Sequence, residues 1–293
     1  MLSLVLTMVL AAQAQLKVAP KMMMGDRKVY ATTVVTEIPG QGTVTVNDET
    51  SISVTGVSAD GCTIEMETTK VTSDAAANNV TGQIIAAAQE LMAGMPVRVA
   101  TDADGKPLRI ENYQEVKEKA LATSDKLIEK MTAAIPQLEQ VMSKDALRQQ
   151  LMENLSEENL LQAMTAITNP LALNGKTIMT GAQEDYTNSQ GLKMKRMYFV
   201  NGKNVTTNGS LNMTKDDMKK LIIAQVEKIM PEQADMVKQN IDQVMESGML
   251  KMDAKETASY ELGDDGWVKS IKAETTNESF GGTVKATSTT TLK

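Results

Sequence analysis

The chain has 293 residues, and its 42% hydrophobic and 23% charged residues are typical of a globular protein. Thirty Lys and Arg residues against 37 Asp and Glu residues give a net charge of −7, which makes nucleic acid an unfavourable partner. The chain has no histidine and one cysteine, Cys62. This composition excludes His-dependent nucleophilic catalysis, zinc sites with histidine ligands and an intrachain disulfide.

The N-terminal residues 1–14 have the pattern of a signal peptide. An apolar run over 2–10 is followed by Ala12-Gln13-Ala14, a small-x-small cleavage pattern. The run is much shorter than the roughly 20 residues that a membrane-spanning helix needs. We therefore expect cleavage before Gln15 and a periplasmic or secreted chain, 15–293, that forms one domain with no membrane span. No Lys or Arg precedes the run, so a first core strand is the alternative.

Most of the remaining chain is predicted to form strands. Segments rich in Thr, Val and Ile alternate in polarity and are separated by Asn-Gly or Asp-Gly pairs, which favour tight hairpins. The six pairs are Asp60-Gly61, Asp104-Gly105, Asn174-Gly175, Asn201-Gly202, Asn208-Gly209 and Asp265-Gly266. We expect strands near 27–38, 42–56, 62–73, 97–101, 107–111, 176–189, 192–200, 203–213, 250–262, 267–277 and 281–291. Short turns between neighbours predict antiparallel pairing, and the abundant Thr predicts one solvated face.

Two blocks of amphipathic helices interrupt the strands. In the first block, Asn112 and Glu115 form a capping pair before a helix that ends at Pro136, and further helices are expected near 137–153 and from Ser156 to about residue 169. The apolar stripe of its first helix comprises Tyr113, Val116, Ala120, Leu121, Ser124, Leu127, Ile128, Met131 and Ile135.

The second block begins with the capping pair Thr214 and Asp217, and Pro231 starts its second helix, which ends near Gly248. Another short helix is expected near 82–93. Each amphipathic helix must bury one face, and a curved sheet offers the nearest apolar surface. We therefore predict an α+β fold in which a large curved antiparallel sheet, similar to half a barrel, carries amphipathic helices on its concave face. A ligand cavity between these layers would be lined by Leu121, Ile128, Met131, Leu221, Ile222 and Met245.

Several local patterns have both a functional and a structural interpretation. Asp102, Asp104 and Gly105 resemble part of a calcium loop, but its first ligand position would be Ala100, so a hairpin turn is favoured. The 22 methionines suit soft metals in principle, yet core filling explains them better. Trp267 is predicted to anchor the core or a sheet edge, and Cys62 to be a buried, unreactive thiol. No motif for a nucleophile or a nucleotide is present, so we expect a non-enzymatic protein without cofactor or metal.

Two stretches carry a resemblance to known proteins. The sequences PVRVATDADGKPLRIENY at 96–113 and GWVKSI at 266–271 resemble secreted proteins of unknown function from Bacteroidetes-type Gram-negative bacteria. The resemblance implies a location in the cell envelope and no known activity. The layout is also similar, in architecture alone, to periplasmic lipoprotein carriers, in which a curved sheet surrounds helices and an apolar cavity.

Three functions remain open at this point. The first is an envelope protein that binds a hydrophobic ligand, such as a lipid or an acylated protein partner, between sheet and helices. The second is a structural or protein-interaction module with no small ligand. The third is a hydrolase with a carboxylate pair, which needs two acids in a cleft with pKa values pushed apart.

Overall fold

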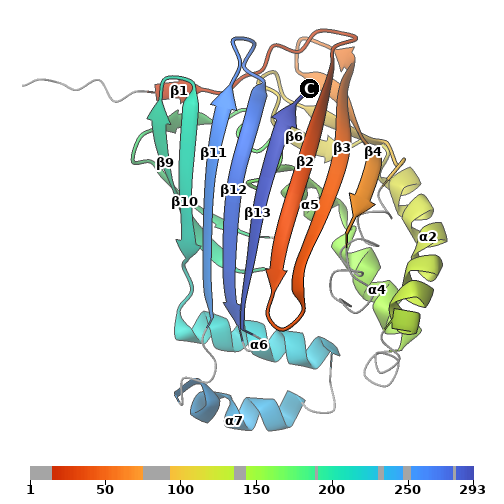
Figure 1. The fold of residues 1–293 in the computed structure, drawn as a ribbon, viewed down its shortest axis with the longest axis vertical. Helices are drawn as coiled ribbons and strands as arrows, with labels where there is room; N and C mark the ends of the chain where they lie inside the picture. Colours follow the sequence, from red (N-terminus) through yellow and green to blue (C-terminus); the bar gives the residue numbers. More distant parts are fainter. Residues whose placement is uncertain are drawn as a thin grey trace, which may run out of the picture.

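The computed structural model describes residues 15–74, 93–134, 143–188, 191–229, 234–246, 252–279 and 282–293. Most of its strands belong to one large sheet (Figure 1). These strands are β2 (Arg27–Ile38), β3 (Gly42–Val57), β4 (Cys62–Ser73), β5 (Val97–Thr101), β6 (Pro107–Ile110), β8 (Gln183–Thr187), β9 (Lys193–Asn201), β10 (Asn204–Leu211), β11 (Asp253–Leu262), β12 (Val268–Ser279) and β13 (Gly282–Leu292). A separate two-stranded sheet joins β1 (Gln15–Lys17) to β7 (Thr177–Met179).

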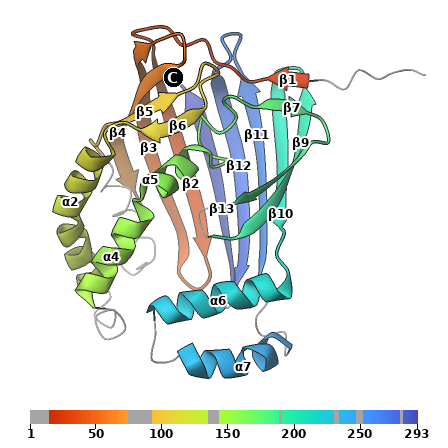
Figure 2. The same cartoon turned by 180° about the vertical axis from the view of Figure 1, so that it is seen from behind.

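The large sheet has 11 strands in the order β6-β5-β4-β3-β2-β13-β12-β11-β10-β9-β8, and every neighbouring pair is antiparallel. The last strand, β13, pairs with β2 near the start of the chain, so the strands before and after the helices form one continuous surface. The sheet is open, with β6 and β8 at its two edges. Figure 2 shows both edges turning toward the same side, which makes that side concave. The predicted antiparallel sheet is confirmed.

One predicted element differs in detail from the observed strands. The segment 176–189 was expected as one strand, but a turn at Thr180-Gly181 divides it into β7 and β8, which belong to different sheets. Gly181 has a φ of 86°, a conformation that glycine adopts without strain. Asn208-Gly209, although a pair of the type that favours hairpins, lies inside β10, as the strand expected at 203–213 requires.

The described helices are α2 (Tyr113–Ala134), α4 (Lys144–Asn154), α5 (Glu157–Met164), α6 (Lys215–Ile229) and α7 (Ala234–Glu246). Capping occurs as predicted at two helix starts, since the Ser156 hydroxyl accepts the Asn159 N–H and Thr214 and Asp217 bond reciprocally. At the third, the Asn112 side-chain oxygen accepts the Arg98 N–H instead. The expected signal peptide at 1–14 and most of the expected helix at 82–93 lie outside the described residues, as does the start of the one expected at 137–153.

The helices occupy three different places around the sheet. Figure 2 shows α5 in front of the concave face, α2 and α4 to one side, and α6 and α7 beyond the ends of the strands. In agreement, α5 packs against β6, α2 packs against α4 and β5, and α6 packs against α7. The prediction placed all the helices on the concave face, but in both views α6 crosses the strand ends instead.

The two faces of the sheet differ in polarity. In β11, every second side chain is buried, and the residues between them, such as Lys255, Thr257 and Ser259, are exposed. This alternation is the normal result of the two-residue period of a strand with one wet face. The concave face therefore faces the protein interior and the convex face faces solvent.

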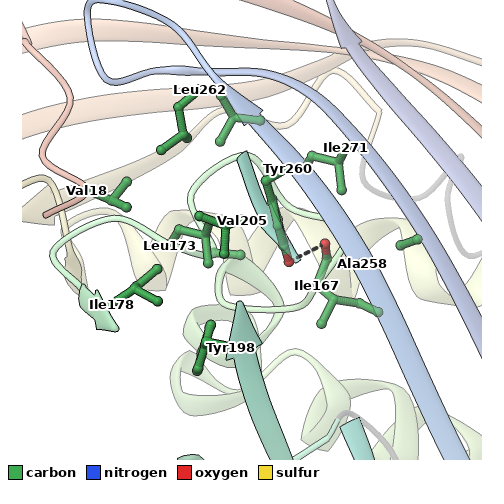
Figure 3. Close-up of a cluster of buried hydrophobic side chains, with 13 residues drawn as sticks. Val18, Ile167, Leu173, Ile178, Tyr198, Val205, Ala258, Tyr260, Leu262 and Ile271 are labelled. Carbon is green, nitrogen blue, oxygen red and sulfur yellow. Dashed lines mark hydrogen bonds between the residues drawn. The ribbon is translucent and has the colours of Figure 1, made fainter. Parts of the chain in front are cut away.

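Two large apolar clusters fill the concave side. One lies between β9–β12 and the segment that follows α5, and Figure 3 shows its side chains around Tyr260. The Tyr260 hydroxyl donates a hydrogen bond of 2.8 Å to the Ile167 carbonyl and so ties that segment to the sheet. The other contains Trp267, which is 1% exposed and donates its indole N–H to the Lys21 carbonyl at 3.0 Å. The prediction of Trp267 as an anchor is confirmed.

Methionine fills the core at some positions only. Met194 is fully buried, and Met95 and Met164 are 5% and 6% exposed. Met23 and Met24, in contrast, are about two thirds exposed, at 66% and 65%. Core filling therefore explains the first three residues and not the pair near the N-terminus.

Among the described residues, every helix is either too short or too polar to cross a bilayer.

Candidate functional site

A cavity of about 600 Å³ lies between the concave face of the sheet and the segment that follows α5. Its floor comes from β8, β9, β11 and β12, and its opposite wall comes from residues 162–178 and the start of β6. Most of the lining residues are polar or charged, although apolar atoms contribute more of the cavity surface than polar atoms do. The volume falls within the range of about 300–1,000 Å³ that is usual for small-molecule sites.

Charged residues cross the floor of this cavity in a single row. The strand register places Glu184 of β8 opposite Arg196 of β9, which lies opposite Gly209 of β10, which lies opposite Glu256 of β11. Residues directly opposite one another share a face of the sheet, so this row belongs to the concave face. Arg196 is only 4% exposed and Glu256 is 9% exposed. A buried row of this kind was not predicted from the sequence.

Gly209 makes room in the middle of that row. A Cβ atom at this position would lie 2.8 Å from the Tyr186 hydroxyl and 3.4 Å from the Glu256 Cβ. With no side chain between them, Arg196 and Glu256 approach across β10 to 3.5 Å between Nη2 and Oε2. This close approach is a physical reason for a glycine inside a strand, where glycine is otherwise unfavourable.

Glu184 is held by a cation and a phenol. The Lys176 ammonium donates to its two carboxylate oxygens at 2.6 and 2.7 Å and to the Tyr198 hydroxyl at 3.1 Å. The Tyr198 hydroxyl also donates to Glu184. Burial alone would raise the pKa of Glu184, but these hydrogen bonds outweigh it and lower the pKa. Glu184 is therefore ionised at neutral pH and is not poised to act as a general acid.

Glu256 and Arg196 share Tyr186 as a neighbour. The Tyr186 hydroxyl donates to Glu256 at 2.6 Å, and the Arg196 guanidinium lies 4.0 Å from the centre of the Tyr186 ring. Burial and the bond to Glu256 raise the pKa of Tyr186, which keeps this phenol a donor at all ordinary pH values. The cation–π contact stabilises the guanidinium without using any of its N–H donors.

Leu121 and Ile128 of α2 do not line this cavity. Leu121 is 38% exposed, because it lies at the margin of the apolar face of the helix and not at its buried centre. Ile128 is 2% exposed and packs in the core. The Met131 side chain lies outside the described part of the structure.

The remaining predicted residues are on α6 and α7. Leu221 packs against the small cluster of Leu192, Met194 and Ala254, while Ile222 and Met245 are half-buried. None of these three residues lines the 600 Å³ cavity, since α6 and α7 lie at the strand ends. The structure therefore does not bring the six predicted residues together into one site.

Two other positions singled out from the sequence have structural roles. Asp102 accepts the backbone N–H groups of Asp104 and Lys106 at 2.9 Å each, in the predicted hairpin turn between the antiparallel strands β5 and β6. Cys62 is half-buried and not fully buried as expected. Burial still raises the pKa of its thiol, which keeps the reactive thiolate scarce.

No protein-family model matches the chain, and no curated protein matches it. Among solved structures, it is similar to lipovitellin, from a study of lipid–protein interactions in that protein, with a TM-score of 0.38 and 11% identity over 93% of this chain and 25% of that chain. It is also similar to DynF from the dynemicin biosynthesis pathway of Micromonospora chersina, with a TM-score of 0.20 and 9% identity over 96% of this chain and 85% of that chain. The chain spans a quarter of the lipovitellin chain, and neither similarity is close enough to indicate a function.

Proposed function

We propose that this chain is a non-enzymatic binding protein that takes an acyl-bearing ligand, either a lipid or the acyl group of a partner protein. The observation that carries the proposal is the cavity of about 600 Å³ between the concave face and residues 162–178. A hydrophobic carrier requires a cavity of ligand size, and a sheet packed flush against its covering segments would have excluded one.

Part of the cavity wall is apolar. Ile167, Leu171, Ala172 and Ile178 line it from the segment after α5 and from β7, and each is at most 4% exposed, so each presents only a small area to the cavity. Transfer of an acyl chain from water into the cavity is favourable by about 25 cal/mol per Å² of its own apolar surface that is buried. The proposal places the ligand beside α5 and the strands β8–β12, not beside α2 and α6 as the sequence suggested.

The proposal includes a location in the cell envelope or outside the cell. Its support is the apolar run at 2–10 followed by Ala12-Gln13-Ala14. A carrier in such a compartment would shield acyl chains from water between membranes or deliver them to a partner.

A matched pair of variants tests whether the cavity is the binding site. Ala166 is half-buried and lines the cavity, whereas Ala163 is exposed on α5 one turn earlier and does not. We expect Ala166→Trp to fill the cavity and weaken binding of palmitate and of hexadecanol by about tenfold or more, equivalent to about 1.4 kcal/mol. Ala163→Trp should bind both compounds as the wild type does, as measured by isothermal titration calorimetry on the chain 15–293.

The outcomes separate the functions considered. Equal weakening in both variants would mean that the cavity is not the site. If wild-type protein binds neither palmitate nor hexadecanol, the carrier function fails, and the interaction-module alternative is then examined by partner capture.

A further inference from the structure

The cavity contains a buried arginine whose hydrogen bonding is incomplete. Arg196 lines the cavity at 4% exposure. Its Nη2 lies 3.5 Å from Glu256, at the limit of a hydrogen bond, and its Nη1 lies 3.9 Å from Glu184. Its Nε is buried and has no hydrogen-bond partner among the described residues. A guanidinium offers five N–H donors, and a buried donor without a partner is costly, so this one calls for an acceptor.

The neighbouring carboxylates already have better partners than Arg196. Glu256 accepts the Tyr186 hydroxyl at 2.6 Å, and Glu184 accepts Lys176 at 2.6 and 2.7 Å. Both carboxylates are thus satisfied by shorter bonds than those that they make to the guanidinium. The Arg196 Nε–H is consequently available to a further acceptor that enters the cavity.

The balance of charge limits what that acceptor can be. Lys176 and Arg196 together carry two positive charges against the two negative charges of Glu184 and Glu256. Lys176 and Arg196 each lie within 4 Å of Glu184, and Arg196 lies within 4 Å of Glu256. A group with two negative charges would be repelled by the two carboxylates. A single carboxylate fits the fork of an arginine and adds only one charge.

We propose that Arg196 binds the carboxylate head of a single-chain fatty acid whose acyl tail occupies the remainder of the same cavity. This inference rests on the proposed function and specifies its ligand class. Arginine suits this role better than lysine, because a guanidinium remains charged when buried and its planar N–H donors can form two parallel hydrogen bonds with a carboxylate.

The first test compares two ligands that differ only in their head group. Palmitate and hexadecanol have the same chain length, and only palmitate has a carboxylate. We expect wild-type protein to bind palmitate about tenfold or more tightly than hexadecanol, because a hydrogen bond to a charged group is stronger than one to a neutral group. This comparison needs no variant and therefore does not depend on the folding of a mutant.

The second test uses variants of arginine. Arg196→Met should weaken palmitate binding by about tenfold and leave hexadecanol binding unchanged. Arg109→Met is the control, because Arg109 is exposed on β6 and lies outside the cavity wall. Circular dichroism confirms that each variant is folded before its affinity is compared.

Each result has a distinct meaning. Binding of both ligands with equal affinity by wild-type protein would overturn the head-group inference and leave the acyl-binding function intact. A folded Arg196→Met protein that keeps its preference for palmitate would overturn it as well. Absence of binding for both ligands would overturn the proposed function itself.

Discussion

The hydrogen bond between Tyr260 and Ile167 offers the sharpest test of how the covering segment is held on the sheet. Tyr260 is 2% exposed and Ile167 is 4% exposed, so water cannot replace either partner. Tyr260→Phe leaves the Ile167 carbonyl buried without a donor, which costs about 1–3 kcal/mol. The variant also avoids the free-energy cost of moving the hydroxyl from water into the core, which offsets part of this loss. We therefore expect a net loss of about 1.5 kcal/mol in the free energy of unfolding.

The loss can be measured by urea unfolding followed through the fluorescence of Trp267, the single tryptophan, which is 1% exposed. The midpoint should fall with an unchanged denaturant slope, and the melting temperature should fall by about 3–6 °C. Tyr113→Phe is the matched control, because the half-exposed Tyr113 hydroxyl takes part in no hydrogen bond with the described residues. A wild-type midpoint for Tyr260→Phe, or an equal loss in the control, would refute the reasoning.

Two further predictions concern pH and backbone geometry. Burial raises the pKa of Glu184, but hydrogen bonds from Lys176 outweigh it and hold this pKa below its value in the unfolded chain. The ionised carboxylate therefore stabilises the fold at pH values above the unfolded pKa. This contribution is lost as the pH falls through the folded pKa. Glu184→Gln should therefore destabilise the protein at pH 7 and flatten the acid limb of its stability profile in urea titrations; an unchanged acid limb would contradict this. A Cβ on Gly61 would overlap the Thr101 carbonyl, so Gly61→Ala should cost more stability than Gly42→Ala, which strains φ in open space. Equal melting temperatures for the two glycine variants would count against the close approach.

Local sequence patterns were sufficient to predict most of the elements of the fold. Period-two polarity and paired Gly turns located the strands, as in β11, where Ala254, Ala258 and Tyr260 alternate with exposed residues. Capping pairs located the helix starts, as at Thr214. These features depend on neighbours in the sequence, so the sequence contains them directly.

The placement of the helices could not be predicted in the same way. An amphipathic stripe requires that one face be buried, but it does not specify the surface that buries it. Leu221 buries its part of the apolar face of α6 against Leu192 and Met194 near the strand ends. The concave face would have buried it equally well. The six predicted cavity residues were therefore drawn from helices that do not cover the cavity.

The charged row was missed because its members are far apart in the sequence and become neighbours only through the strand register. A local signal did exist. Arg196 lies two residues from both Met194 and Tyr198 and so shares their inward face of β9. Glu256 likewise lies between the inward-facing Ala254 and Ala258 of β11. A charged residue at an inward strand position needs a partner, and searching for such positions would have found both residues.

The central claim is that the cavity holds an acyl ligand, and native mass spectrometry of the protein purified from a cell envelope tests it most directly. The account predicts a bound mass in the range of a single-chain fatty acid, identified by lipid extraction of the same sample and absent from the Ala166→Trp variant. A wild-type protein that is ligand-free and takes up no added palmitate or hexadecanol would contradict it.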